Sequence, residues 1–442
     1  MKIGNPIFLA LLVSLGTGGL ARAQDAYTIP DDLTPVSEWA DGFTADEAEA
    51  FRKAYSAAEF SKGSDITAFA YLNIAEVLPN ALISRGPGQV SELETDPMPR
   101  IADVVATTDL GTMPLSAAMA DPRSRMQGFM VLHEGRIVFE AYPGMPSDAK
   151  HMWASSSKTI TGLLIHMLAS EGLVDLNAPM SQYLAFTEGS PFGEVKVEDV
   201  LHMRTGLNYE ETHANINNPE HPVAQAFGAA LTARGVPIGP GMRDLVIKVE
   251  RHRPPNTAFE YSTYNTQMLG DVVEEVTGMP WNRVVSERIW KHAGMDGDGL
   301  LAISAAGEPL TGGLFSATLR DFGRYGMLFT PSWSIVSDER VVPENYLESV
   351  YAAVNPDIYL EAFQGPRMVK AFGEDDAPRG QSYQWDAIFE DGDLYKAGLG
   401  GQGIYVSPET DTVVVYFSTV WQNSLSIASY ARAIVKQMFR GN

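Results

Sequence analysis

The sequence predicts an α+β fold in which an antiparallel sheet is flanked by helices and interrupted by an inserted, mostly helical domain. Strand-like runs joined by tight turns stand early in the chain, at residues 128–142, and again late, at residues 403–418. Between them, residues from about 180 to 300 have the pattern of helices and loops. If the early and late strands pair in one sheet, the helices between them form a domain inserted into the sheet domain.

These observations also set the expected domain boundaries. We expect a signal peptide, an N-terminal extension, a sheet domain made of two separated segments, and the helical insertion. The ranges are 1–23 for the signal peptide, 24–120 for the extension, 121–178 with 300–442 for the sheet domain, and 179–299 for the helical domain.

The first residues have the pattern of a targeting segment. Lys2 precedes the short apolar run "IFLALLVSLG", and small Ala21 and Ala23 stand where a signal peptidase cuts. The run is too short to cross a bilayer. We therefore expect an exported protein, periplasmic or secreted, with no membrane span after signal removal.

Individual elements follow from periodicity and turn chemistry. "GFMVLHEGRIVFEAY" predicts a hairpin around Glu134 and Gly135, and "GIYVSPETDTVVVYFS" predicts a second one around residues 408–411. "SSSKTITGLLIHML" predicts a helix that ends near Gly172. Other helices are predicted for "TADEAEAFRKAYSAAEF", for "DVVEEVTGMPWNRVVSERIW" with a break at residues 278–280, and for "SLSIASYARAIVKQMF".

Composition excludes several classes of function. The 32 Lys and Arg against 55 Asp and Glu give a net charge of −23, which disfavours nucleic-acid partners. The absence of cysteine excludes disulfides, thiol nucleophiles and thiolate metal sites. The 8 histidines are scattered with no His-Glu-x-x-His motif, so we do not expect catalysis by a metal.

The pattern Ser-x-x-Lys, which places a hydroxyl and an amine one helical turn apart, occurs twice. Ser147 pairs with Lys150, and Ser155 pairs with Lys158. The second pair opens an apolar helix, where free amides and the helix dipole favour an oxyanion. A lysine held neutral can take the serine proton. Spacing and context favour Ser155, although alone it could equally be a helix cap.

Two further elements follow in the order that Ser-x-x-Lys hydrolases require. "FEYSTYNTQMLG" places Tyr261 and Thr263 at the start of a helix, and "YKAGLGGQGIYV" places Lys396 and Gly398 before a glycine turn. We expect the phenol of Tyr261, beside two ammonium groups, to have a lowered pKa and to relay a proton. The joint occurrence of the three elements favours catalysis.

With these motifs in place, the chain resembles the serine β-lactamase and penicillin-binding-protein superfamily, in its class C-like branch, over roughly residues 120–430. The order of "SSSK", "VEDVLHMRTGL", "FEYSTYNTQMLG", "GGLFSATLRDFGRYG" and "GLGGQGIYVSPETD" carries the resemblance. Within that branch it resembles the 6-aminohexanoate-dimer hydrolases. The resemblance implies a β-lactamase/transpeptidase-like fold and hydrolysis of an ester or amide through an acyl-enzyme, without a cofactor.

The resemblance also implies roles for individual residues. Ser155 is the nucleophile, Lys158 its base and Tyr261 the partner acid and base. The N–H groups of Ser155 and of Leu399, or Gly400, form the oxyanion hole. The resemblance further assigns substrate contacts to Thr263, Lys396, Gly398 and Gly400.

One departure from the family pattern bears on the substrate. Tyr261-Ser262-Thr263 stands where class C β-lactamases have Tyr-x-Asn, so we do not expect efficient β-lactam hydrolysis. An esterase or a D-amino-acid-type peptidase is the alternative within the hydrolases. A non-catalytic penicillin-binding-like module that binds a peptide or a cell-wall fragment is the alternative from another class.

Overall fold

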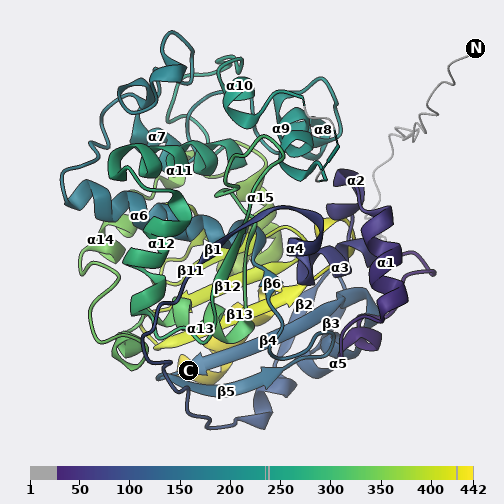
Figure 1. The fold of residues 1–442 in the computed structure, drawn as a ribbon. Helices are drawn as coiled ribbons and strands as arrows, with labels where there is room; N and C mark the ends of the chain where they lie inside the picture. Colours follow the sequence, from purple (N-terminus) through teal and green to yellow (C-terminus); the bar gives the residue numbers. More distant parts are fainter. Residues whose placement is uncertain (1–26, 234, 237–238, 425–426, 442) are drawn as a thin grey trace, which may run out of the picture.

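The computed structural model describes residues 27–441 except 234, 237–238 and 425–426. Two layers of structure are visible in Figure 1, a region of sheet and a region of helices above it. The predicted signal peptide, residues 1–23, lies outside the described residues. No helix in the described part of the chain is long and apolar enough to cross a membrane.

The main sheet is antiparallel, with strand order β5-β4-β13-β12-β11-β10-β9. Early strands lie beside late ones, so that blue β4 borders yellow β13 in Figure 1. This confirms the prediction that distant segments share one sheet. The strands are β4 (Met126–His133), β5 (Arg136–Ala141), β9 (Gly380–Ser382), β10 (Trp385–Ile388), β11 (Leu394–Gly398), β12 (Gln402–Ser407) and β13 (Thr412–Ser418).

Both faces of this sheet are covered. On β13, Val413 and Val415 belong to one hydrophobic core, whereas Val414 and Tyr416 belong to the other. Side chains alternate across a strand, so this alternation requires helices on both sides. The helix α13 packs against β4 and β13, and α16 packs against the opposite core.

A second sheet, which the sequence analysis did not predict, has the order β1-β7-β8-β6. The strand β1 lies in the segment 24–120 and pairs with β7, so this segment contributes to the shared core. The short strand β6 leads directly to Ser155. The strands are β1 (Asn80–Ile83), β6 (His151–Met152), β7 (Gly299–Ala302) and β8 (Phe315–Ala317), and a separate pair is formed by β2 (Val105–Thr108) and β3 (Gly111–Pro114).

Helices precede, interrupt and follow the strands. The helices before the insertion are α1 (Ala45–Ala54), α2 (Ala57–Phe60), α3 (Asp65–Leu72), α4 (Ile74–Val77), α5 (Leu115–Ala120) and α6 (Lys158–Ser170). Those between β6 and β7 continue with α7 (Val197–Leu201), α8 (His213–Ile216), α9 (Pro222–Leu231), α10 (Met242–Val246), α11 (Thr263–Thr277) and α12 (Trp281–Arg288). The last are α13 (Leu319–Met327), α14 (Tyr346–Ala352), α15 (Gln364–Phe372) and α16 (Ala428–Ile434).

Most local predictions agree with these bounds, but the helix predicted for residues 44–60 is broken between α1 and α2, where Ser56 is extended and caps the second helix. The β4–β5 turn has φ of 47° at Glu134 and 77° at Gly135, the positive values that a two-residue hairpin loop needs. The helices α11 and α12 are separated by Gly278, whose φ of 65° ends the first of them. The final helix continues past α16 as a π-helical turn, Val435–Phe439.

Candidate active site

Ser155 lies on a short 3₁₀ helix, Ala154–Ser157, between β6 and α6. The residue before it, Ala154, has a φ of 48°, a left-handed value that is uncommon for a residue with a side chain. Buried Trp153 fixes the turn, because its ring stacks on Phe322 at 4.1 Å and its backbone N–H donates to the carbonyl of Phe315. Such strain persists only where packing enforces it, and here it orients the serine.

The same turn is attached to strand β11. The Ser156 hydroxyl donates to the Lys396 carbonyl at 3.2 Å. Gly398, at the end of β11, approaches so closely that a Cβ there would lie 2.6 Å from the Trp153 carbonyl oxygen. Glycine is therefore required at this position by packing, and it brings Leu399 to the nucleophile's side of the sheet.

Lys158 is fully buried at the first residue of α6 and its amine contacts three oxygens. Its Nζ lies 3.1 Å from the Ser155 Oγ and 3.0 Å from the Thr263 Oγ1, and it donates to the Gly312 carbonyl. No carboxylate of the described residues forms an ion pair with it. Burial without an ion-pair partner among the described residues disfavours the ammonium form of this side chain.

Burial accordingly lowers the pKa of Lys158 to about 7, with the positive charge of Lys396 acting in the same direction. Glu211 and Asp386 oppose the shift at longer range. A lysine with this pKa is partly neutral at physiological pH. It can therefore accept the proton of the hydroxyl beside it.

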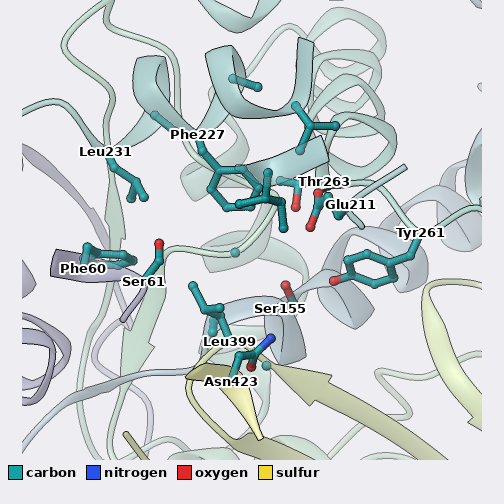
Figure 2. A pocket seen from close by; sticks show the side chains of 18 of the residues that line it. Phe60, Ser61, Ser155, Glu211, Phe227, Leu231, Tyr261, Thr263, Leu399 and Asn423 are labelled. Carbon is teal, nitrogen blue, oxygen red and sulfur yellow. Dashed lines mark hydrogen bonds between the residues drawn. The ribbon is translucent and has the colours of Figure 1, made fainter. Parts of the chain in front are cut away.

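Tyr261 lies beside Ser155, and its hydroxyl points toward the serine (Figure 2). The amines of Lys396 and Lys158 stand 4.5 Å and 5.5 Å from the centre of its ring. The prediction of a lowered pKa for this phenol is wrong. Burial, followed by the negative charges of Asp386 and Glu211, raises its pKa well above the ordinary value, while contact with the Ser155 hydroxyl acts in the opposite direction.

Lys396 forms a buried ion pair with Asp386 on the neighbouring strand. Its Nζ lies 2.5 Å from Asp386 Oδ1, and the Ala397 N–H donates to Oδ2 at 3.1 Å. The two side chains are 0% and 2% exposed, so the pair is closed to water. Lys396 thus places a fixed positive charge beneath the ring of Tyr261.

Two backbone N–H groups are free to bind an oxyanion. Among the described residues, the N–H groups of Ser155 and Leu399 donate to no protein acceptor. The N–H of Gly400, the alternative named by the resemblance, donates to Asn423 Oδ1 at 3.1 Å. The structure therefore favours Leu399 over Gly400 as the partner of Ser155.

A cavity of about 680 Å³ opens above Ser155. Figure 2 shows Ser155 between an apolar wall, with Phe60, Phe227 and Leu231, and a polar side with Tyr261 and Glu211. Of the predicted residues, those that line the cavity are Ser155, Tyr261, Thr263, Gly398 and Leu399. Lys158, Lys396 and Gly400 lie behind its wall, so neither Lys396 nor Gly400 contacts the cavity directly.

Ser147, the competing serine, is exposed and does not line this cavity. Asn265, near the missing asparagine of the Tyr-x-Asn triplet, accepts a hydrogen bond from Tyr209 at 2.5 Å and is buried away from the cavity. Ser147 therefore cannot replace Ser155 as the nucleophile of this cavity, and Asn265 cannot replace the substrate-binding asparagine of the Tyr-x-Asn triplet.

Three charged residues of the site were not found from the sequence. Glu211 accepts from the N–H of Thr263, Asp386 pairs with Lys396, and Arg367 lines the cavity from α15. A signal existed for Asp386, since a single carboxylate inside the apolar strand "YQWDAIF" needs a buried partner. In the described part of the chain, no group of three or more His, Asp or Glu side chains could hold a metal ion.

The family model described as Beta-lactamase matches residues 116–437, which is most of the chain. The protein therefore belongs to the beta-lactamase family, a family of hydrolases. The predicted superfamily and fold class are confirmed.

Relatives give the comparison more detail. The chain is 26% identical over 352 residues to a 6-aminohexanoate-dimer hydrolase of Paenarthrobacter ureafaciens, covering 79% of this chain and 85% of the relative. A solved Bacillus anthracis protein assigned as a 6-aminohexanoate-dimer hydrolase has a TM-score of 0.69 at 22% identity, covering 84% and 93% of the two chains. The hydrolase EstCE1, described as having promiscuous acyltransferase activity, has a TM-score of 0.54 at 14% identity, covering 74% and 96%.

Proposed function

We propose that the protein is a serine hydrolase that cleaves a carboxylic ester or a linear amide through an acyl-enzyme on Ser155. The observation that carries this proposal is the 3.1 Å contact between the Ser155 hydroxyl and a buried Lys158 amine whose pKa is lowered to about 7. A purely structural serine would not need beside it a buried lysine that has no ion-pair partner among the described residues.

The proposed reaction has two steps. Ser155 Oγ attacks the substrate carbonyl carbon while its proton passes to Lys158 Nζ. The N–H groups of Ser155 and Leu399 bind the negative oxygen of the tetrahedral intermediate. The bond to the alcohol or amine then breaks, and Tyr261, protonated at neutral pH because its pKa is raised, passes a proton to the leaving group. Water attacks the acyl-enzyme in the reverse sequence of proton transfers and releases the acid.

The preferred substrate in this proposal is an unbranched amide or ester. Similarity to a 6-aminohexanoate-dimer hydrolase supports a linear amide. The apolar wall of the cavity supports an aliphatic acyl chain. Hydrolysis of β-lactams is expected to be slow, because Thr263 stands where an asparagine amide would hold the antibiotic.

Two alternatives remain to be tested beside this proposal. An esterase or a D-amino-acid-type peptidase would use the same residues, and a similar fold occurs in EstCE1, a hydrolase described as having promiscuous acyltransferase activity. A non-catalytic peptide or cell-wall binding module would retain the cavity but would not require the Ser155–Lys158 contact.

One screen separates these possibilities. Short esters, linear amide dimers, D-peptides and nitrocefin are offered to the wild type and to Ser155→Ala. We expect turnover of esters and linear amides by the wild type alone. Turnover that Ser155→Ala retains would refute the proposed nucleophile, and binding without any turnover would favour the binding module.

We also propose that residues 1–23 are a signal peptide and that the protein is exported. Lys2, the apolar run and Ala21-x-Ala23 support this proposal. N-terminal sequencing of protein purified from the native host is expected to begin at Gln24. A mature chain that retains Met1 would contradict the proposal.

A further inference from the structure

Part of the cavity wall comes from a region of the chain that lies before the family match. That match begins at residue 116. The N-terminal segment, residues 27–115, precedes it and includes the helix α2. The residues of this segment that line the cavity are Ala58, Phe60, Ser61 and Lys62. The reaction proposed above gives them no role, so their place in the cavity needs an explanation of its own.

Hydrogen bonds hold this part of the N-terminal segment on two sides. The Tyr55 hydroxyl donates to the carbonyl of Leu231 at 3.1 Å, which ties the segment to the end of α9. The N–H of Gln422 donates to the carbonyl of Lys62 at 3.0 Å, which ties it to the turn after β13. Leu231 and Gln422 themselves line the cavity. The segment is therefore a fixed part of the wall.

Phe60 is the buried side chain that this segment places in the wall. Its ring is 1% exposed and lies near Leu231 in Figure 2. The ring also packs against Tyr71 and Tyr55, whose centroids lie 5.1 Å and 6.2 Å from its own. Neither tyrosine lines the cavity, so both support the ring from the protein side. Because close-packed side chains resist added volume, Phe60 closes the cavity at this point.

The wall beside Phe60 is apolar along the length of α9. The helix contains no charged residue, and its cavity-lining side chains recur at the spacing of one helical face. They are Val223, Ala226, Phe227, Ala230 and Leu231. The one cation that the N-terminal segment adds to the lining, Lys62, is paired with Glu59 at 2.9 Å. This wall suits an uncharged hydrocarbon chain.

The position of Phe60 indicates which part of a substrate it meets. Figure 2 shows Ser155 between Tyr261 and Phe60, with the tyrosine hydroxyl directed at the serine. In the proposed reaction Tyr261 gives its proton to the leaving group, so the leaving group lies on the Tyr261 side. The acyl chain then extends toward Phe60.

We propose that Phe60 sets the length of the acyl chain that the enzyme accepts. The substrate class is an ester or amide of an unbranched, uncharged carboxylic acid whose chain ends against the Phe60 ring. This inference rests on the proposed function for the direction of the chain. Each methylene that the cavity buries should raise kcat/KM about fourfold, the fold-change that corresponds to the transfer of one CH₂ group from water. A methylene beyond the ring meets close-packed atoms, so kcat/KM should pass through a maximum.

A series of 4-nitrophenyl esters tests the proposal with a constant leaving group. The unbranched acyl group grows from acetyl to dodecanoyl, and kcat/KM is measured for the wild type, Phe60→Ala and Phe60→Leu. Phe51→Ala is the control. Phe51 belongs to the same segment and packs on Phe69 at 5.7 Å, but it does not line the cavity.

The readout is the acyl length at which kcat/KM is greatest. Phe60→Ala should move this maximum toward longer chains by about two carbon atoms or more, because the volume of the ring becomes free. Phe60→Leu should move it less. Phe51→Ala should leave the maximum in place even where it lowers every rate. A maximum that stays in place in Phe60→Ala, or that moves equally in Phe51→Ala, would overturn the proposal.

A pair of isomeric esters tests the direction of the chain without any variant. Ethyl hexanoate and hexyl acetate contain the same atoms, but the longer chain is on the acyl side in the first and on the alcohol side in the second. The wild type should hydrolyse ethyl hexanoate with a kcat/KM about 10-fold or more above that of hexyl acetate. Equal values, or a preference for hexyl acetate, would overturn the proposal even if Phe60→Ala does not fold.

A ligand that is not turned over separates this proposal from the proposed function. The 2-alkanones carry a carbonyl and an alkyl chain but no leaving group. By calorimetry, their affinity for the wild type should rise about fourfold per methylene up to a limit, and Phe60→Ala should move that limit to longer chains. This binding pattern without hydrolysis of any ester would refute the proposed function alone. Affinity that does not depend on chain length would overturn the role of Phe60.

Discussion

The amine of Lys158 lies 3.1 Å from the hydroxyl of Ser155, and the lysine side chain is fully buried with no ion-pair partner among the described residues. This relationship links the fold to the chemistry. The helix α6 and the 3₁₀ turn before it place the two side chains on one face, and burial keeps the amine partly neutral.

Removal of the nucleophile should abolish turnover while the fold survives. Ser155→Ala is expected to lower kcat by about 10³-fold or more. Steady-state assays on a short phenyl ester measure this, with circular dichroism as the check on folding. Ser147→Ala is the matched control, because exposed Ser147 also has a lysine three residues later yet lies outside the cavity. A large loss in Ser147→Ala would contradict the assignment.

The activity should rise with pH through the pKa of Lys158. The neutral amine is the form that accepts the serine proton, so kcat/KM should increase as the pH rises through about 7. Because the pKa of Tyr261 is raised, its deprotonation should not lower the rate near neutral pH. A pH–rate profile measures both features. Lys158→Arg, which stays charged, should be inactive at every pH, and appreciable activity in it would exclude Lys158 as the base.

Loss of the Tyr261 hydroxyl should slow catalysis without disturbing the cavity. Tyr261→Phe is expected to lower kcat by about 10²-fold or more, because a positioned acid or base contributes that much. KM for a neutral ester should change little, since the ring remains. Nearly normal kcat in Tyr261→Phe would refute its role in proton transfer.

The buried Lys396–Asp386 pair should be essential for stability. Asp386→Ala leaves an uncompensated ammonium in a dry site and is expected to lower the free energy of unfolding by about 3–5 kcal/mol. Urea denaturation measures the change. The control is Glu49→Ala at the exposed pair with Lys53, which should change stability by less than about 0.5 kcal/mol. Equal effects would mean that the Lys396–Asp386 pair is not buried as described.

Residue 398, where β11 contacts the 3₁₀ turn that carries Ser155, should not tolerate a side chain. In Gly398→Ala the new Cβ would lie 2.6 Å from the Trp153 carbonyl oxygen, so the turn and strand must separate, and we expect both stability and kcat to fall. Gly228→Ala is the control, because a Cβ there meets no atom within 4 Å and alanine favours the helix α9. Full activity in Gly398→Ala would show that the close contact between Gly398 and Trp153 is not needed to position Leu399 for catalysis.

The features predicted correctly from the sequence are those set by neighbouring residues. The β4–β5 hairpin follows from its turn residues, and the Ser155–Lys158 contact follows from three-residue spacing on one turn. The pKa of Tyr261 was predicted in the wrong direction. The sequence placed two lysines near Tyr261. The burial of Tyr261 and the negative charge of Asp386, which outweigh the effect of these lysines on its pKa, arise only from folding.

Features that depend on distant segments were also missed. The strand β1 pairs with β7 across about half of the chain, so no local pattern indicates the second sheet. Arg367 reaches the cavity from α15, a helix without any motif. Its place in the cavity follows only from the packing of α15 against the rest of the chain.

Covalent labelling of Ser155 tests the central claim most directly. The wild type is treated with a fluorophosphonate, digested, and mapped by mass spectrometry, with Lys158→Arg treated in parallel. The account predicts one labelled residue, Ser155, and little labelling in Lys158→Arg because its serine is not activated. Labelling of Ser147 or another serine, or an enzyme that hydrolyses esters while Ser155 stays unlabelled, would contradict the account.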